Sequence, residues 1–275
     1  MDAVVIANQT NKHIDAALEV CDVGRPFYLE KPISHCSSGV VDVMDLVSRK
    51  GLVVEVGCQL RTHPNLKFLK EHLLNNESTK PLTFRSAVGY RLDRWRPNTD
   101  YKKSYSAFSQ YGGGALSDLI HEIDIAIWLF GSVIDVFAHL TKVSDLALQA
   151  DDLANITLAF DTSLTGQIQL DMLSPVYRRT LEIILTDSIY RWDYTTGQVF
   201  RATEEDGESL VHTVDKKFSR NDLFVEHMQH FISRIDDPKI PPVCSYVDGM
   251  SALEVVLACR RSDASGNLSR VTKIQ

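Results

Sequence analysis

The pair Asp118 and His121 is the most informative set of side chains that could carry out chemistry in this chain. The two residues lie three positions apart and follow the run Gly112-Gly113-Gly114. Residues at i and i+3 are neighbours on a helix surface, and a carboxylate beside an imidazole can orient the ring and raise its basicity. This is the arrangement of a general base, although a solvated polar helix face would have the same spacing. The three glycines favour a close approach of the backbone to another group.

Two further polar clusters follow short apolar runs. In Glu30-Lys31-Pro32, which follows Phe27 to Leu29, the lysine ammonium could exchange a proton with a ligand hydroxyl. The segment from Asn8 to His13 follows residues 3–7, and a helix beginning there would offer free N–H groups to a ligand. Taken singly, ordinary capping residues would explain the segment from Asn8 to His13 equally well. For Glu30-Lys31-Pro32 alone, an ordinary surface tripeptide is the better explanation.

The elements that must position these clusters begin with three short apolar runs. Residues 3–7, 27–29 and 52–56 predict buried strands, and apolar stripes from residue 14 and from a helix starting at Ser34 predict the helices between them. This order is typical of a parallel βαβ sheet with right-handed crossovers. Because ligands of open α/β sheets bind at the carboxyl ends of the strands, the clusters after residues 7 and 29 should share one edge.

The pattern changes after about residue 78. Leu82–Tyr90 resembles a strand, and residues 115–131 predict one helix that contains Asp118 and His121. Period-two alternation in five later runs predicts an antiparallel sheet with one covered face: 133–140, 153–160, 164–172, 180–185 and 189–194. Closing helices are expected near 221–235 and 246–261. The predicted fold is α/β, a partial Rossmann-type parallel sheet in residues 1–62 followed by an α+β domain, 63–275, with a large, mainly antiparallel sheet.

Composition and charge exclude several classes of function. The chain has 275 residues with 29 Lys+Arg and 36 Asp+Glu, a formal charge of −7, so nucleic acid is not an expected partner. No apolar run reaches the roughly 18 residues of a membrane span. The five cysteines show no CxxC spacing, which favours reduced thiols in a cytoplasmic protein. No metal site is expected, because His227 and His230 lack a third ligand.

Together the clusters resemble the Gfo/Idh/MocA family of NAD(P)-dependent oxidoreductases. The resemblance extends over essentially the whole chain and includes the strand at residues 3–7 with its polar turn, Glu30-Lys31-Pro32, Gly57-x-Gln59-x-Arg61 and the helical segment from Gly112 to Gly131. It implies hydride transfer between NAD or NADP and a secondary hydroxyl of a sugar, cyclitol or sugar nucleotide. It also implies a homodimer or homotetramer formed through the C-terminal sheet.

The resemblance assigns roles to particular residues. The expected catalytic residues are Lys31, Asp118 and His121. The expected cofactor-binding residues are Asn8, Thr10, Asn11, His13, Glu30, Lys31, Gln59 and Arg61. Substrate is expected to contact Asp118, His121 and an aromatic-rich loop that contains Trp95, Arg96, Tyr101 and Tyr105. Two departures from the family pattern are the three-residue spacing of Asp118 and His121, where many members have four, and Asn8-Gln9 in place of the commoner Thr-Pro.

The start of the chain departs further from the family pattern. Members carry a Gly-x-Gly-x-x-Gly turn that holds the cofactor pyrophosphate, and none of the 14 glycines here forms it. We therefore expect roughly 60–70 residues of the first Rossmann half to be absent from this sequence. Three interpretations are open. In the first, the chain is an oxidoreductase whose N-terminal part is missing from this sequence. In the second, it is a truncated, inactive relative that acts as a sugar-binding or oligomerisation protein. A hydrolase using Asp118 and His121 is less well supported, because neither nucleophile nor metal ligands accompany them.

Overall fold

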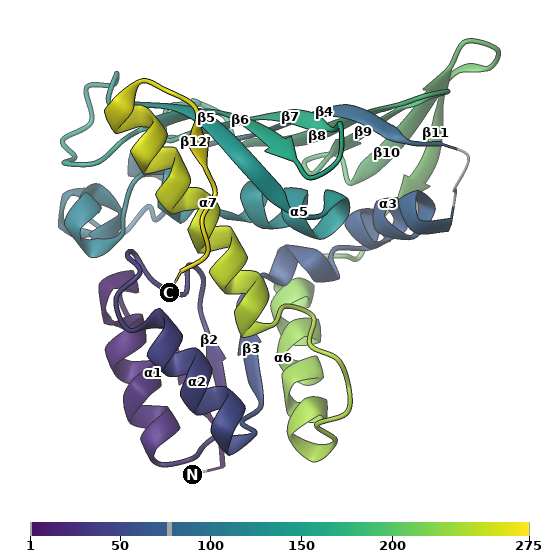
Figure 1. Cartoon of the computed structure of the whole chain (residues 1–275). Coiled ribbons are helices and arrows are strands. Elements are labelled where there is room, and N and C mark those ends of the chain that lie inside the picture. Colours follow the sequence, from purple (N-terminus) through teal and green to yellow (C-terminus); the bar gives the residue numbers. More distant parts are fainter. Residues whose placement is uncertain (1, 76–78, 275) are drawn as a thin grey trace.

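The computed structural model describes residues 2–75 and 79–274, which form two sheets joined by helices (Figure 1). The smaller sheet has three parallel strands in the order β1-β2-β3: β1 (Val4–Ile6), β2 (Phe27–Leu29) and β3 (Val54–Val56). Helices α1 (His13–Asp22) and α2 (Val40–Lys50) cover one face and α6 (Arg220–Asp236) lies on the other. All three residues of β2 are buried, which is why this strand is apolar throughout.

The helix α2 begins six residues later than the sequence pattern predicts. The expected start at Ser34 is wrong, because Gly39 adopts φ = 71°, a left-handed conformation that an α-helix cannot contain. A Cβ at Gly39 would lie 2.6 Å from the Ile14 side chain, so the glycine also permits the close approach of α1 to this turn. Ser34 to Ser38 instead form a bent, non-helical segment before α2.

The larger sheet has nine strands in the order β11-β10-β9-β8-β4-β7-β6-β5-β12. Its neighbours are antiparallel except β4 and β7, which pair in parallel. The strands are β4 (Pro81–Gly89), β5 (Val133–Thr141), β6 (Leu153–Phe160), β7 (Thr165–Asp171), β8 (Arg178–Leu185), β9 (Ile189–Asp193), β10 (Gln198–Thr203), β11 (Gly207–Thr213) and β12 (Ser269–Arg270). Alternating burial along β6 and β7 shows that one face packs on a core, as the period-two pattern predicts.

Helices cover that buried face. In Figure 1, α3 (Pro64–Asn75), α5 (His121–Phe130) and α7 (Tyr246–Ser265) lie on the same side of the sheet. The long helix α7 contributes Val255 and Val256 to the core beneath the large sheet and Leu253 to the core of the small sheet. One helix therefore fixes the two sheets relative to each other. The domain boundary predicted at residue 62 stays a prediction.

Several elements differ from the sequence expectation. The alternating runs did not predict β10, β11 or β12, and α3 was not predicted either. Most of β11 is exposed, so it has no apolar alternation to recognise. The helix predicted over 115–131 is two helices, α4 (Ala115–Asp118) and α5, separated at Leu119 and Ile120. Among the described residues, no helix is long and apolar enough to cross a membrane.

Candidate active site

A cavity of about 630 Å³ lies between the carboxyl ends of the small sheet and the large sheet. Most of the residues that sequence analysis predicted for the site line it: Asn8, Thr10, His13, Glu30, Lys31, Gln59, Trp95, Arg96, Tyr105, Asp118 and His121. They come from five separate segments of the chain, so the fold brings together clusters that are far apart in the sequence.

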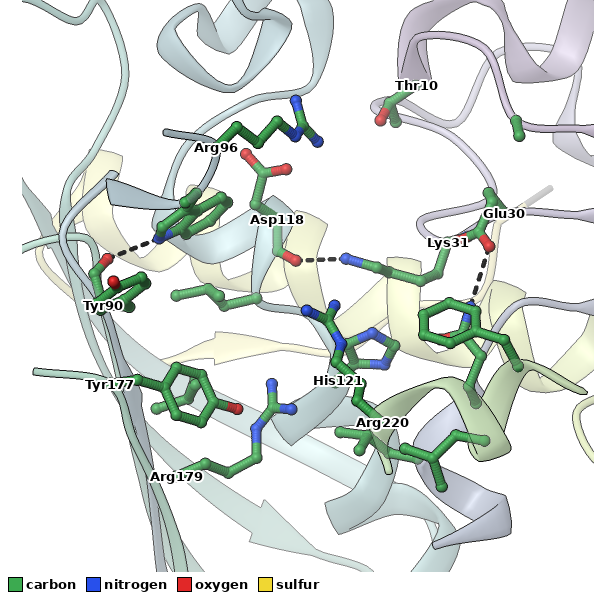
Figure 2. Close-up of a pocket in the computed structure, with 18 of the residues that line it drawn as sticks. Thr10, Glu30, Lys31, Tyr90, Arg96, Asp118, His121, Tyr177, Arg179 and Arg220 are labelled. Carbon is green, nitrogen blue, oxygen red and sulfur yellow. Dashed lines mark hydrogen bonds between the residues drawn. The ribbon is translucent and has the colours of Figure 1, made fainter. Parts of the chain in front are cut away.

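The Lys31 side chain crosses the cavity to the helical segment that carries Asp118. Its Nζ donates a hydrogen bond to the Asp118 backbone carbonyl at 2.5 Å (Figure 2). That carbonyl is available because Asp118 is the last residue of α4, and the final carbonyls of a helix lack intrahelical partners. The break between α4 and α5, which the sequence did not predict, therefore supplies the acceptor that fixes the lysine ammonium.

Asp118 and His121 both line the cavity although they do not share one continuous helix. Burial raises the pKa of the Asp118 carboxyl, while the Lys31 ammonium and the Tyr105 hydroxyl act in the opposite direction. Backbone contacts hold α4 in place, because Asp151 accepts from the Leu116 N–H at 2.8 Å. Asp118 therefore lies at a cavity wall whose backbone is fixed.

His121 is the first residue of α5, and its environment disfavours the protonated ring. Burial lowers the pKa of the imidazole well below its ordinary value, and the positive charges of Lys31, Arg179 and Arg220 lower it further. Its buried Nδ1 has no hydrogen-bond partner among the described residues. A neutral imidazole always has one unprotonated ring nitrogen, so His121 at the cavity wall is able to accept a proton from a bound hydroxyl.

The glycines before α4 bring the backbone close to other protein segments. A Cβ at Gly113 would lie 2.3 Å from the Tyr105 carbonyl oxygen. Gly112 has φ = 85°, and a Cβ there would lie 2.8 Å from the Thr10 side chain. The predicted close approach is therefore made to the aromatic loop and to the turn after β1, two segments that themselves line the cavity.

Polar residues form the wall at the edge of the parallel sheet. The Glu30 carboxylate accepts a hydrogen bond from Gln59 Nε2 at 3.0 Å, and burial raises the pKa of Glu30. Gly57 leaves room for this carboxylate, because a Cβ there would lie 3.0 Å from it. The two ring nitrogens of His13 lie 2.7 Å from the Pro32 carbonyl and 3.1 Å from the Asn8 carbonyl. His13 therefore connects the polar segment after β1 with the Glu30-Lys31-Pro32 cluster.

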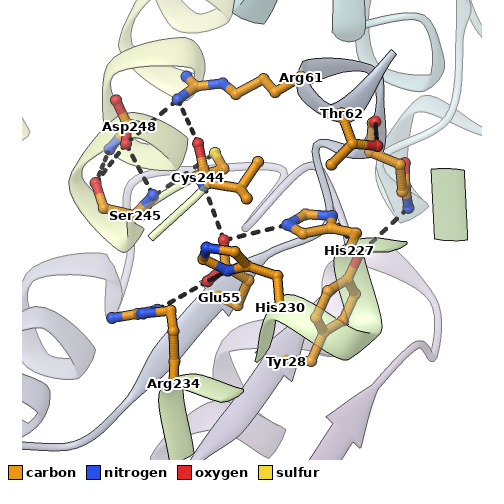
Figure 3. A network of polar contacts seen from close by, with 12 residues as sticks. Tyr28, Glu55, Arg61, Thr62, His227, His230, Arg234, Cys244, Ser245 and Asp248 are labelled. Atoms are coloured by element: carbon orange, nitrogen blue, oxygen red, sulfur yellow. Dashed lines mark hydrogen bonds and ion pairs between the residues drawn. The ribbon is translucent and has the colours of Figure 1, made fainter. Parts of the chain in front are cut away.

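A buried network around Glu55 lies behind this wall and includes His227 and Tyr28 (Figure 3). Glu55, which is fully buried, lies 3.1 Å from His227 Nε2 and accepts from Arg234 Nη1 at 2.8 Å. The hydrogen bond from His227 lowers the pKa of Glu55 against the opposing effect of burial. The other ring nitrogen of His227, Nδ1, lies 3.2 Å from the Tyr28 hydroxyl oxygen. The Tyr28 oxygen in turn lies 3.5 Å from the Gln59 amide nitrogen.

Three of the expected site residues lie elsewhere. Arg61 forms a buried ion pair with Asp124 at 2.7 Å and lies outside the cavity lining, as does Asn11. The Tyr101 hydroxyl accepts a hydrogen bond from the Ala147 N–H at 3.1 Å and also lies outside that lining. The cofactor and substrate roles expected for these residues remain predictions, and the side-chain contacts of Arg61 and Tyr101 are with the protein itself.

The structure also brings a group of possible metal ligands together near Arg61. Cys58, Cys244 and Asp124 present ligand atoms within 4.8 Å of one another, a proximity that the cysteine spacing did not indicate. The Asp124 carboxylate is already paired with the Arg61 guanidinium, so its charge is compensated without a metal ion.

Residues that sequence analysis missed line the rest of the cavity, most of them on the opposite wall, which the large sheet forms. The large sheet and the segments that flank its strands contribute aromatic rings and one arginine, and α6 contributes a second arginine. These residues are Tyr90, Tyr177, Arg179, Tyr194, Arg220 and Phe224. The close spacing of Tyr177 and Arg179 could have indicated that they belong to the site, because both stand at the start of a strand predicted from Thr180.

Residues 86–272 match the family model described as the oxidoreductase family, C-terminal alpha/beta domain, of the Gfo/Idh/MocA group. The chain belongs to this family. The resemblance predicted from its motifs is thereby confirmed.

Curated relatives of this Gfo/Idh/MocA chain include two inositol dehydrogenases. It is 24% identical over 272 residues to the scyllo-inositol 2-dehydrogenase (NAD(+)) of Bacillus subtilis (strain 168), covering 97% of this chain and 76% of the relative. It is also 24% identical over 269 residues to the myo-inositol 2-dehydrogenase of Thermotoga maritima, covering 95% and 77% respectively.

Solved structures share the fold of this family member. A levoglucosan dehydrogenase in complex with NADH has a TM-score of 0.88 at 20% identity, covering 100% of this chain and 81% of that one. GenD2 from gentamicin A biosynthesis, in complex with NAD, has a TM-score of 0.82 at 22% identity, covering 99% and 79%. The predicted fold class, a small parallel sheet followed by a large, mostly antiparallel one, is confirmed.

Proposed function

We propose that this chain is an NAD(P)-dependent oxidoreductase that oxidises a secondary hydroxyl of a sugar or cyclitol. The observation that carries the proposal is the convergence of Lys31, Asp118 and His121 on one cavity at the carboxyl edge of the parallel strands. The curated relatives named as NAD(+)-dependent and inositol dehydrogenases support the same reaction class.

The residues at the sheet edge fit the nicotinamide end of the cofactor. Thr10, Glu30, Lys31 and Gln59 would hold it, because they place hydroxyl, carboxylate, ammonium and amide groups on one wall of a cavity of about 630 Å³. When bound, the cofactor supplies a carbon that accepts the hydride. In the same proposal residues 1–62 are the C-terminal part of a dinucleotide-binding domain, and 63–275 form the substrate and oligomerisation domain.

Lys31 and His121 would handle the hydroxyl proton. The Lys31 ammonium is fixed by the Asp118 carbonyl and would stabilise negative charge as it develops on the substrate oxygen. Burial and the neighbouring cations lower the pKa of His121, which keeps the ring neutral and leaves it one unprotonated nitrogen that would take the proton. The fixed Lys31 ammonium and the neutral His121 ring are therefore both in place before substrate binds.

The opposite wall fits a ring-shaped polyol. Tyr90, Tyr177 and Tyr194 offer aromatic faces for the apolar C–H faces of a sugar, and the phenol hydroxyls give hydrogen bonds at the ring edge. Trp95 is fixed by a hydrogen bond from its indole nitrogen to the Tyr90 carbonyl at 2.8 Å. Such rigid aromatic walls favour a substrate of small-molecule size over a peptide.

The test is turnover with a set of polyols. The chain should reduce NAD+ or NADP+ when given at least one of myo-inositol, scyllo-inositol, levoglucosan or a sugar nucleotide, followed by the absorbance of the reduced cofactor. A deuterium label on the oxidised carbon should appear in the reduced nicotinamide. If calorimetry instead detects sugar binding while no cofactor is reduced, the chain is the sugar-binding relative that the sequence left open.

We further propose self-association through the uncovered face of the large sheet and a cytoplasmic location. Figure 1 shows the helices on one side of this sheet only, and the exposed face includes Phe137, which is 46% exposed.

The cysteines and the interface lead to separate tests. All five cysteines are unpaired thiols, which fits a reducing compartment. Sedimentation of the Phe137→Lys variant should show a smaller species than the parent, and cell fractionation tests the location. A variant that sediments as the parent does would contradict the interface.

A further inference from the structure

The cavity carries more positive than negative side chains. Arg179 lies on the wall formed by the large sheet, and its Nε is 2.7 Å from the Glu122 carboxylate behind it. Arg96 stands on the same side of the cavity as Asp118 (Figure 2). Arg220 makes no ion pair within the described part of the chain, so its positive charge is not compensated by a protein carboxylate.

The position of Arg220 is defined despite the lack of an ion pair. It is the first residue of α6, and its guanidinium lies 5.7 Å from the centre of the Phe224 ring, one helical turn further along. Figure 2 shows Arg220 reaching toward His121, while Arg179 and Tyr177 point into the same part of the cavity. Two guanidinium groups and a phenol therefore face one space beside the proposed proton acceptor.

We propose that the substrate is an anionic sugar whose carboxylate or phosphate group binds to Arg220 and Arg179. The inference rests on the proposed function and names its substrate class. A guanidinium binds planar carboxylate or phosphate oxygens with two parallel hydrogen bonds, a geometry that a neutral hydroxyl does not match. Arg179 is 8% exposed and already has Glu122 as a partner, whereas the exposed Arg220 has no carboxylate partner among the described residues. An anionic group of the substrate would supply the acceptor that Arg220 lacks.

The cofactor does not account for these arginines. The residues proposed to hold the nicotinamide end lie on the wall formed by the small sheet, after β1, β2 and β3. Arg179 comes from β8, on the wall formed by the large sheet, where the aromatic rings also lie. Arg220 stands at the start of α6 and reaches toward His121. The anion they bind is therefore part of the molecule that contacts the aromatic rings.

The experiment is calorimetric titration of the full chain with matched sugars, in the absence and presence of NADH. The probes are D-glucose, D-glucuronate and D-glucose 6-phosphate, which separate a carboxylate from a phosphate at the same ring size. At least one anionic probe should bind about tenfold or more tightly than glucose, and its affinity should fall as salt rises. The carboxylate and the phosphate arms then identify which anion the subsite takes.

Variants locate the effect. In Arg220→Ala the preference for the anionic sugar should fall about tenfold, Arg220→Lys should restore part of it because the charge returns, and thermal unfolding verifies that each variant folds. The control is Arg25→Ala, an exposed arginine before β2, which should bind the probes as the parent does.

Two outcomes would overturn the inference. In the first, glucose and both anionic probes bind with equal affinity, or none of them binds. In the second, the preference for the anionic probe is the same in Arg220→Ala as in the parent. Tight binding of an anionic probe that is lost in Arg220→Ala, without any cofactor reduction, would support the anion subsite while contradicting the proposed oxidoreductase. The failures of the two proposals are therefore distinguishable.

Discussion

Replacing Lys31 by methionine should lower kcat for hydroxyl oxidation by about 10²- to 10⁴-fold, the usual range for loss of a positioned acid–base group. Methionine keeps the length of the side chain and removes the ammonium that donates to the Asp118 carbonyl. The substrate oxygen then loses the cation that would stabilise its negative charge. Steady-state kinetics with the best substrate of the polyol set measure the effect.

The matched control is Lys239→Met, which removes an exposed lysine after α6 that lies outside the cavity. It should keep kcat within about twofold, since surface substitutions away from special features have small effects. Both variants should unfold near the temperature of the parent, so that a loss of activity in Lys31→Met is not a loss of fold. A Lys31→Met enzyme with nearly the parental kcat would show that the proton passes through other groups.

Replacing Arg61 by methionine should destabilise the fold by about 3–5 kcal/mol, because it leaves the buried Asp124 carboxylate without its partner. Both side chains of this ion pair are almost fully buried, at 3% and 1% exposure. Arg61 Nη1 also donates to the Val243 carbonyl at 3.1 Å, so the variant loses a contact to the segment before α7. Urea unfolding of parent and variant gives the difference in free energy.

The double variant Arg61→Met, Asp124→Leu separates charge from packing. It should recover most of the lost stability, because replacing both partners of a buried ion pair by apolar residues is often neutral or stabilising. If Arg61→Met unfolds at the same urea concentration as the parent but binds NADH much more weakly, Arg61 acts on the cofactor, as the family resemblance implies, and does not stabilise the fold.

Much of the fold follows from burial patterns that the sequence displays directly. Residues 27–29 are apolar because both faces of β2 are covered, and the alternation over 153–160 matches a strand with one buried face. The strand β11 could not be predicted in this way, because most of its residues are exposed. Its place in the sheet depends on pairing with β10, which is a long-range contact without a local pattern.

The site residues could be predicted where a polar side chain directly follows the end of a predicted parallel strand. Lys31 and Gln59 follow β2 and β3, so the rule for parallel sheets places both at the cavity. Arg61 follows the same strand but packs inward, because its partner Asp124 comes from α5 and no local pattern reveals that contact. Arg220 stands at the start of a helix predicted from residue 221, and only the tertiary arrangement directs it into the cavity.

Titration of the 275-residue chain with NADH and NADPH tests the central claim, that this cavity holds a nicotinamide cofactor beside the substrate. Trp95 lines the cavity, so tryptophan fluorescence should be quenched with a Kd below about 1 mM for at least one of the two cofactors. Lys31→Met should weaken that binding, and Lys239→Met should not. Absence of saturable quenching by either cofactor at millimolar concentration would contradict the account.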